Sequence, residues 1–131
     1  MRKVQDTNLI CAAIPSQFAA VGALEVGRDY TESWMPEQAR VREIVLSSLW
    51  NLCDCVSVAD TGGAFYVFAR INNTRLNDLE LVRLLVEDHG VAVVPGSAFG
   101  SATECWLRIS YGALRGESVI AGIGRLCEGL S

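Results

Sequence analysis

The feature that most constrains the fold is a change of hydrophobic period in the middle of the chain. After Pro36 the sequence "EQARVREIVLSSLWNL" repeats apolar side chains at helical spacing, at Val41, Ile44, Val45, Leu49 and Leu52. Beyond Gly62-Gly63 the run "AFYVFARI" is rich in the aromatic and β-branched residues that strands prefer. A helical pattern returns in "NDLELVRLLVEDHG". Interleaved helices and strands favour an α/β domain.

Alternation along the central strand assigns its side chains to two faces. One face is expected to carry Phe65, Val67, Ala69 and Ile71. The other is expected to carry Ala64, Tyr66, Phe68 and Arg70. The predicted strand therefore has one face for a core and one face that is aromatic and charged.

The N-terminal part predicts two helices. Residues 1–15 are interpreted as an irregular or partly helical lead-in that Pro15 closes, and Ser16 is the expected N-cap of a first helix. The segment "RDYTESW" interrupts the helical pattern, and Pro36 is expected in the first turn of the second helix. That helix should expose a solvated side at Arg40, Arg42 and Glu43.

The C-terminal part predicts two more helices and two more strands. Asn77 with Glu80 has capping-box spacing, and Gly90 fits the end of that helix. "VAVVPGSAF" is expected to be a short buried strand ended by Pro95-Gly96, and "ECWLRISY" a further strand. The last helix should face inward with Val119, Ile123, Leu126 and Leu130. We therefore expect one domain with two layers, in which helices pack on one side of a small β-sheet.

Composition excludes several classes of function. The net charge is −4 without runs of like charge, which argues against nucleic acids and anionic membranes as partners. No segment has the roughly 20 apolar residues of a membrane span, and no secretory signal is evident, so we expect a cytoplasmic protein. Half of the residues are apolar, which predicts exposed apolar surface awaiting a partner. The scattered cysteines predict free buried thiols and no metal site, with a weaker alternative of a Cys53–Cys55 redox pair.

Few residues are candidates for chemistry. His89 precedes Gly90 and is interpreted as a helix C-cap, while Glu87 and Asp88 diverge on their helix, so no catalytic residue is predicted. The loop "VVPGSAFG" is interpreted as a turn, although glycine-rich loops after strands also hold anions. The eleven basic residues include a single lysine, Lys3.

Arg108 is the strongest candidate for a binding residue. It lies in the middle of the strand "ECWLRISY", where Trp106 and Ser110 share its face. A guanidinium cannot be neutralised and is costly to bury without a partner. One interpretation is that Arg108 pairs with a structural carboxylate or reaches solvent at the sheet edge. The other is that it faces a cleft and binds the carboxylate of a ligand. The planar fork of arginine matches two carboxylate oxygens at once.

In combination, "GGAFYVFARI", "LVRLLVEDHGVAVVPGSAFG" and "WLRISYG" resemble the C-terminal, small domain of class I/II, fold-type I pyridoxal-phosphate-dependent aminotransferases. "SQFAAVGAL" resembles the helix just beyond that family's cofactor domain, so the resemblance covers residues from about 4 onward. It implies that Arg108 binds the substrate α-carboxylate and that Phe99 lies beside the substrate entrance. It also implies pyridoxal phosphate as cofactor and an amino acid and a 2-oxo acid as substrates of the complete enzyme.

The departures from the family lead to a second set of expectations. The Schiff-base lysine and the other cofactor ligands of the family belong to its large domain, and no residue here matches them. Residues 1–131 are therefore expected to be the small domain alone, truncated or excised, catalytically inactive and without bound pyridoxal phosphate. Exposed apolar surface around Phe18 should produce homo-oligomers. The alternatives are a non-enzymatic remnant that binds carboxylate metabolites or proteins, and a subunit that complements a separate large domain.

Overall fold

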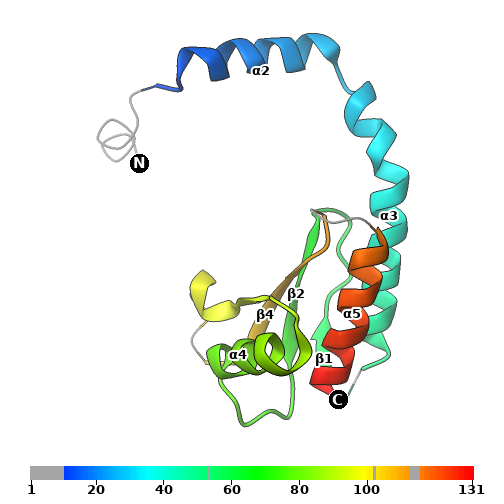
Figure 1. Cartoon of the computed structure of the whole chain (residues 1–131), viewed down its shortest axis with the longest axis vertical. Coiled ribbons are helices and arrows are strands. Elements are labelled where there is room, and N and C mark those ends of the chain that lie inside the picture. Colours follow the sequence, from blue (N-terminus) through cyan, green and yellow to red (C-terminus); the bar gives the residue numbers. More distant parts are fainter. Residues whose placement is uncertain (1–10, 53, 102, 113–115) are drawn as a thin grey trace. The chain divides into compact units, whose positions relative to one another are not determined.

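The computed structural model describes residues 11–52, 54–101, 103–112 and 116–131 (Figure 1). The chain divides into two units, Met1–Pro36 and Glu37–Ser131. The second unit contains all the strands and most of the helical residues, and it carries the candidate site described below.

The centre of the second unit is a four-stranded antiparallel sheet with the strand order β1-β2-β4-β3. The strands are β1 (Val56–Val58), β2 (Tyr66–Ile71), β3 (Val94–Pro95) and β4 (Trp106–Ser110). In the β2–β4 pair, Val67 lies opposite Ile109 and Ala69 opposite Leu107. These four side chains are buried, so one face of the sheet forms the core.

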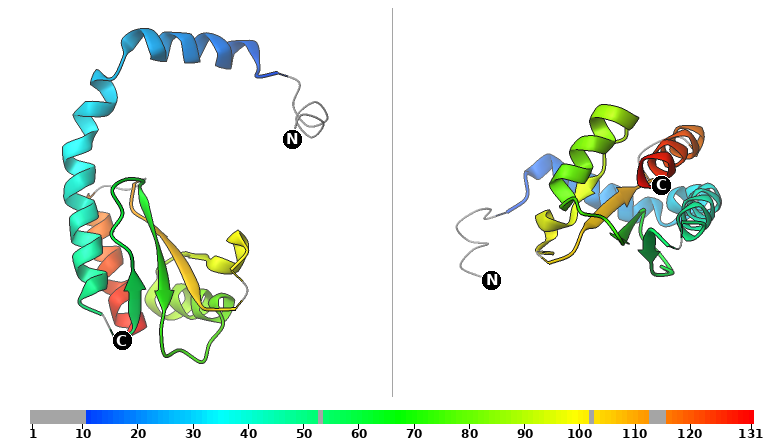
Figure 2. Two further views of the ribbon diagram at one scale, coloured as in Figure 1. Left: turned by 180° about the vertical axis from the view of Figure 1, so that it is seen from behind. Right: turned by 90° about the horizontal axis from the view of Figure 1, so that it is seen from below.

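Helices cover that buried face. α4 (Asp78–His89), α5 (Gly116–Leu130) and the part of α3 (Asp29–Trp50) that belongs to the second unit contribute to the same core as β2 and β4 (Figure 2). The inward residues of α5 are Val119, Ile123, Leu126 and Leu130, as the helical spacing predicts. The predicted two-layer α/β class, with helices on one side of a small sheet, is confirmed.

The ends of α4 match the sequence signals. The Asn77 side chain accepts a hydrogen bond from the Glu80 amide at 2.9 Å, and Glu80 Oε2 accepts one from the Asn77 amide at 3.0 Å. Such a reciprocal box satisfies two donors that the first turn leaves free. Gly90 ends the helix with a left-handed φ of 62°, which glycine adopts without strain.

Both N-terminal helices begin earlier than the sequence predicts. α2 (Ile14–Val26) takes Pro15 into its first turn, where the missing N–H is tolerated, so Ala13 rather than Ser16 is the N-cap. α3 begins at Asp29 and contains Pro36 in its interior. A helix can continue through a proline, because only the hydrogen bond of that residue is lost and the steric clash is local. The acidic residues Asp29 and Glu32 in the first turn favour the earlier start of α3.

Three further expectations are corrected. Arg42 does not lie on a solvated side: its side chain is 20% exposed, donates to Asp60 Oδ1 at 2.9 Å and also donates to the Thr61 carbonyl. The buried strand expected in "VAVVPGSAF" is only the half-buried β3, because a 3₁₀ turn, η1 (Gly96–Phe99), follows at once. Phe65 precedes β2 and is exposed.

The four cysteines that the structure describes are free but not uniformly buried. Cys11 is exposed, whereas Cys55, Cys105 and Cys127 are half-buried. Cys53 lies outside the described residues, and with it the Cys53–Cys55 pair. Within residues 11–52, 54–101, 103–112 and 116–131, no helix combines the length and apolarity needed to cross a bilayer.

Candidate functional site

The face of the sheet opposite the helices, here called the outer face, carries aromatic and charged side chains. They are Tyr66, Phe68 and Arg70 from β2 and Trp106, Arg108 and Ser110 from β4. Their positions follow from the pleat, because every second side chain on β2 and β4 points away from the core. The sequence alternation assigned these six side chains to one face of each strand correctly, whereas Phe65, which it assigned to the core face, is exposed.

Arg108 is held between two aromatic rings on this face. Its Cζ lies 5.4 Å from the centroid of the Tyr66 ring and 4.9 Å from that of the Phe99 ring. Both distances are within the range of cation–π attraction. Its Nε is buried and has no hydrogen-bond partner among the described residues. The structure therefore brings the two residues singled out by the sequence, Arg108 and Phe99, into contact.

Most other arginines of the described chain are paired with carboxylates. Such ion pairs join Arg28 to Glu32, Arg40 to Glu37, Arg42 to Asp60, Arg70 to Glu104 and Arg83 to Glu87. No carboxylate of the described residues lies within ion-pair distance of Arg108, although this side chain is only partly exposed. Because a half-buried guanidinium without a counter-ion is costly, Arg108 stays the candidate binding residue of the outer face.

Stacked rings extend the surface beside Arg108. Phe68 and Trp106 are stacked, with centroids 4.9 Å apart and planes inclined by 9°. The Phe99 ring meets Phe68 edge to face at 6.0 Å. Trp106 Nε1 donates to Glu104 at 3.2 Å, and Glu104 in turn pairs with Arg70 at 3.1 Å. The outer face thus holds one neutralised arginine and one free arginine, separated by an aromatic stack.

The turn η1 brings Phe99 to this face. Its first residue, Gly96, is buried against β4, where an added Cβ would lie 2.4 Å from Trp106 Cβ and 2.9 Å from the Trp106 carbonyl oxygen. Gly100 ends the turn with φ of 88°. The two glycines of "GSAFG" therefore serve close approach and a left-handed turn end rather than an anion cradle.

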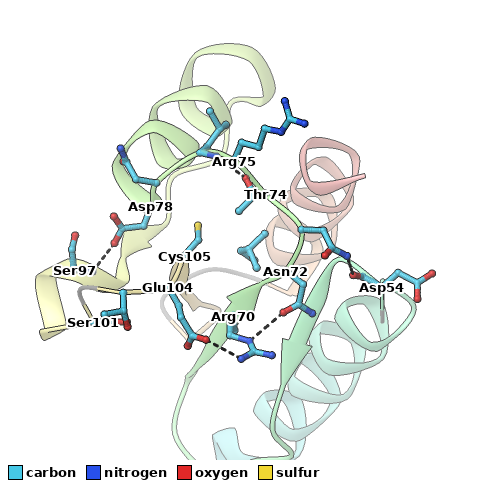
Figure 3. A pocket seen from close by; sticks show the side chains of 15 residues that line it. Asp54, Arg70, Asn72, Thr74, Arg75, Asp78, Ser97, Ser101, Glu104 and Cys105 are labelled. Carbon is cyan, nitrogen blue, oxygen red and sulfur yellow. Dashed lines mark hydrogen bonds and ion pairs between the residues drawn. The ribbon is translucent and has the colours of Figure 1, made fainter.

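A hollow of the second unit lies elsewhere. It has a volume of about 780 Å³ and is formed by the β2–α4 loop, the start of α4 and the segment before β4, where Asn72, Thr74, Asp78, Ser97 and Glu104 are among the lining residues (Figure 3). Arg108 and Phe99 do not line it. Two arginines line it: Arg70, which is paired with Glu104, and the exposed Arg75. The two residues that the sequence singled out thus lie outside this hollow.

The remaining sequence candidates do not form a second site. His89 is the last residue of α4, but the C-cap of this helix is Gly90, so the interpretation of His89 as the C-cap is wrong. Glu87 pairs with Arg83 at 2.8 Å, four residues away on the same helix. Among the residues that the structure describes, no three histidine, cysteine, aspartate or glutamate side chains gather as metal ligands.

The sequence did not reveal the partners of Arg108. Tyr66, Phe68 and Trp106 are aromatic residues on alternating strand positions, a pattern equally typical of a half-buried sheet surface. The register of β2 on β4, which places Phe68 opposite Arg108, has no local signal.

Comparison with known proteins identifies relatives over most of the chain. Residues 1–123 match the family model for class I and II aminotransferases. The chain is 38% identical to the aromatic aminotransferase ISS1 of Arabidopsis thaliana, over 98% of this chain and 32% of that protein. It is 39% identical to an aspartate aminotransferase of Pyrococcus abyssi, over 85% of this chain and 28% of that protein.

Solved structures agree with these matches. The aromatic aminotransferase of Pyrococcus horikoshii OT3 superposes with a TM-score of 0.78 at 35% identity, over 96% of this chain and 34% of that one. The chain thus spans about a third of the length of the relatives it matches. On the evidence of its sequence and its fold, the chain belongs to the class I and II aminotransferase family.

Proposed function

We propose that this chain is the substrate-binding, C-terminal small domain of a pyridoxal-phosphate-dependent aminotransferase, which transfers an amino group between an amino acid and a 2-oxo acid. Arg108 binds the α-carboxylate of the substrate. The observation that carries this proposal is the half-buried guanidinium of Arg108, which lies between the Tyr66 and Phe99 rings without a carboxylate partner among the described residues. Family membership supports the reaction class.

The surroundings of Arg108 favour recognition of a carboxylate in one orientation. The rings of Tyr66 and Phe99 restrict the guanidinium, and its Nε is shut away from solvent. No described group accepts a hydrogen bond from the Nη atoms, so these two nitrogens are free to donate to both oxygens of a carboxylate. A guanidinium that is already oriented loses less entropy when the ligand binds.

Phe99 has a second role beside Arg108. Its side chain is 52% exposed although it contacts both Arg108 and Phe68. The exposed part of the ring is available to the side chain of the bound amino acid. We therefore assign Phe99 to the wall of the substrate entrance.

The residues described here do not fit the cofactor by themselves. Pyridoxal phosphate supplies an electron-accepting ring to the complete enzyme, and it is held through a lysine amine. The only lysine of this chain is Lys3, which lies outside the described residues. No described side chain provides that amine, and we assign no step of the cofactor chemistry to this chain. Alone, the 131-residue chain binds carboxylates without catalysing transamination.

The helix α2 supplies an association surface. None of its side chains is buried, and Phe18 and Leu24 are 74% and 81% exposed. Exposed apolar surface of this kind marks contact sites. α2 packs on the cofactor domain in the complete enzyme and on a second copy when that domain is absent.

Titration with a simple carboxylate tests the Arg108 assignment. The probe is 3-phenylpropionate, with neutral 3-phenylpropionamide as the matched ligand, and the reporter is the Arg108 Nε–Hε signal in NMR spectra. Two charge-assisted hydrogen bonds contribute about 3–6 kcal/mol, which corresponds to a Kd between roughly 6 mM and roughly 0.04 mM. Arg108→Gln should abolish the response to the carboxylate in the neighbouring Phe99 and Tyr66 signals.

Arg70→Gln is the matched control, because Arg70 lies on the same face but is paired with Glu104. This variant should bind 3-phenylpropionate like the wild type. Equal responses to the acid and the amide, or undiminished binding by Arg108→Gln, would contradict the assignment.

A further inference from the structure

A buried aspartate connects helix α4 to the turn that carries Phe99. Asp78, the first residue of α4, is 8% exposed, and its Oδ2 accepts a hydrogen bond from the Ser97 amide at 2.6 Å (Figure 3). It is the one buried charged side chain in the part of the chain that the structure describes. Burying a carboxylate is unfavourable unless hydrogen bonds replace its water, so this contact needs an explanation.

Helix capping does not explain it. Asn77 and Glu80 already form the complete capping box of α4. A negative charge near the helix N-terminus is favourable in an exposed position as well, so the dipole alone gives no reason for burial. Besides the amides at the start of α4, the carboxylate of Asp78 accepts a hydrogen bond from Ser97, which belongs to a different element.

The turn has few other attachments. Residues 96–99 hydrogen-bond mainly to each other and to the residues just after them: the Gly100 amide donates to the Ser97 carbonyl at 3.1 Å and the Ser101 amide to the Gly96 carbonyl at 3.3 Å. The β3–β4 pairing ends at Pro95, before the turn starts. Among the described residues, the Asp78–Ser97 bond is the hydrogen bond that joins the turn to a helix.

The position of the turn determines the position of the Phe99 ring. Ser97 and Phe99 belong to the same four-residue 3₁₀ turn, and the ring lies 4.9 Å from the Arg108 Cζ. Gly96 fixes the other side of the turn against Trp106. A continuous series of contacts thus runs from Asp78 through Ser97 and Phe99 to Arg108.

We propose that Asp78 is a positioning residue for the Arg108 site: its carboxylate holds η1 so that the Phe99 ring stays against the guanidinium. The inference rests on the proposed carboxylate-binding function of Arg108. The electrostatics are consistent with this role. Burial raises the pKa of the Asp78 carboxyl, but hydrogen bonds from Ser97 and from the amides at the start of α4 outweigh it and hold the pKa below the ordinary value.

The test reads the Arg108 side chain directly. In the 131-residue chain, the ring current of Phe99 should shift the Arg108 Nε–Hε signal, and Arg108→Lys identifies this signal by its disappearance. In Asp78→Ala the signal should move more than half of the way to its position in Phe99→Leu. Asp78→Asn keeps an oxygen acceptor, so its Arg108 signal should lie between the signals of the wild type and of Asp78→Ala. Affinity for 3-phenylpropionate should fall roughly two- to fivefold in Asp78→Ala.

Two controls separate positioning from general damage. Asp88→Ala removes an exposed aspartate of the same helix and should leave the Arg108 signal in place. The amide signals of Leu107 and Ile109 report whether the β4 core is intact. Should Asp78→Ala fail to fold, Asp78→Asn decides: a shift of its Arg108 signal toward the position in Phe99→Leu supports the positioning role, and a signal at the wild-type position overturns it.

The outcomes distinguish the two proposals. An Arg108 signal that coincides with that of the wild type in a folded Asp78→Ala variant overturns the positioning role, whether or not 3-phenylpropionate binds. A shifted signal in a chain whose wild type binds no 3-phenylpropionate supports the connection between Asp78 and Arg108 but overturns the proposed function.

Discussion

Phe68 and Arg108 lie directly opposite each other in the β2–β4 pair. This register brings the aromatic residues of one strand beside the free guanidinium of the other, and η1 adds Phe99 from a third element. The site on the outer face is thus assembled by long-range pairing, and its parts can be tested separately.

Replacing Phe99 by leucine should weaken carboxylate binding without unfolding the chain. The substitution keeps an apolar side chain but removes the cation–π contact with Arg108, which is worth about 0.5–1 kcal/mol at a site of this exposure. Affinity for 3-phenylpropionate, measured by NMR titration, should fall roughly two- to fivefold. Leu79→Ala, at an exposed position on α4, serves as the control and should leave the affinity unchanged.

Two glycine-to-alanine substitutions should change stability in opposite directions. Gly96→Ala drives a methyl group into Trp106 and should lower the free energy of unfolding by about 1–3 kcal/mol. Gly124→Ala meets nothing within 4 Å inside α5 and should raise it by about 0.5–1 kcal/mol. Urea denaturation followed by circular dichroism gives both values. A Gly96→Ala variant whose free energy of unfolding equals that of the wild type would contradict the close packing of η1 on β4.

Tyr111 should make the fold sensitive to alkaline pH. Burial raises the pKa of its phenol above the ordinary value near 10, and its hydroxyl donates to the Ala64 carbonyl at 3.1 Å. The neutral phenol is favoured in the folded state, so its contribution to stability is complete below the unfolded-state pKa and is lost as the pH rises through the folded-state value. Urea midpoints measured across that range should fall more steeply for the wild type than for Tyr111→Phe.

The exposed surface of α2 should cause self-association. Sedimentation velocity is expected to show species larger than a monomer at high protein concentration, because Phe18 and Leu24 are both largely exposed. The double substitution Phe18→Glu and Leu24→Glu introduces like charges there and should restore the monomer. A wild-type chain that stays monomeric at every accessible concentration would refute this expectation.

The 131-residue chain should not catalyse transamination when pyridoxal phosphate is supplied. The described residues provide no lysine amine to hold the cofactor, and Lys3 is the only lysine in the sequence. A coupled assay with amino acid and 2-oxo acid should give the rate of the buffer with cofactor alone. Turnover that persists after repeated purification and disappears in Lys3→Ala would prove the expectation wrong.

Periodicity was sufficient to predict most of the secondary structure and the faces of its elements. The helical spacing of α5 predicted its four buried residues, and the alternation of β2 and β4 predicted which side chains leave the core. These patterns are local, because a helix or strand repeats within a few residues. The start of α3 was missed because a proline within an extended helix carries the same signal as a proline at its first turn.

The candidate site was predictable only in part. The resemblance to a family drew attention to Arg108 and Phe99, and the structure brings the two together. The contribution of Tyr66 and the connection from Asp78 to Ser97 depend on strand register and on the path of the turn. The local sequence predicts neither of them, since both follow from contacts between segments far apart in the chain.

The close approach of Gly96 to Trp106 has a consequence for how this site can evolve. The atoms that exclude a side chain at position 96 are the carbonyl carbon and oxygen of residue 106, which every amino acid has, and its Cβ, which only glycine lacks. The requirement for glycine therefore does not depend on which residue occupies position 106. Mutational libraries that aim to change substrate preference can therefore vary Trp106, whereas Gly96 should tolerate almost no substitution.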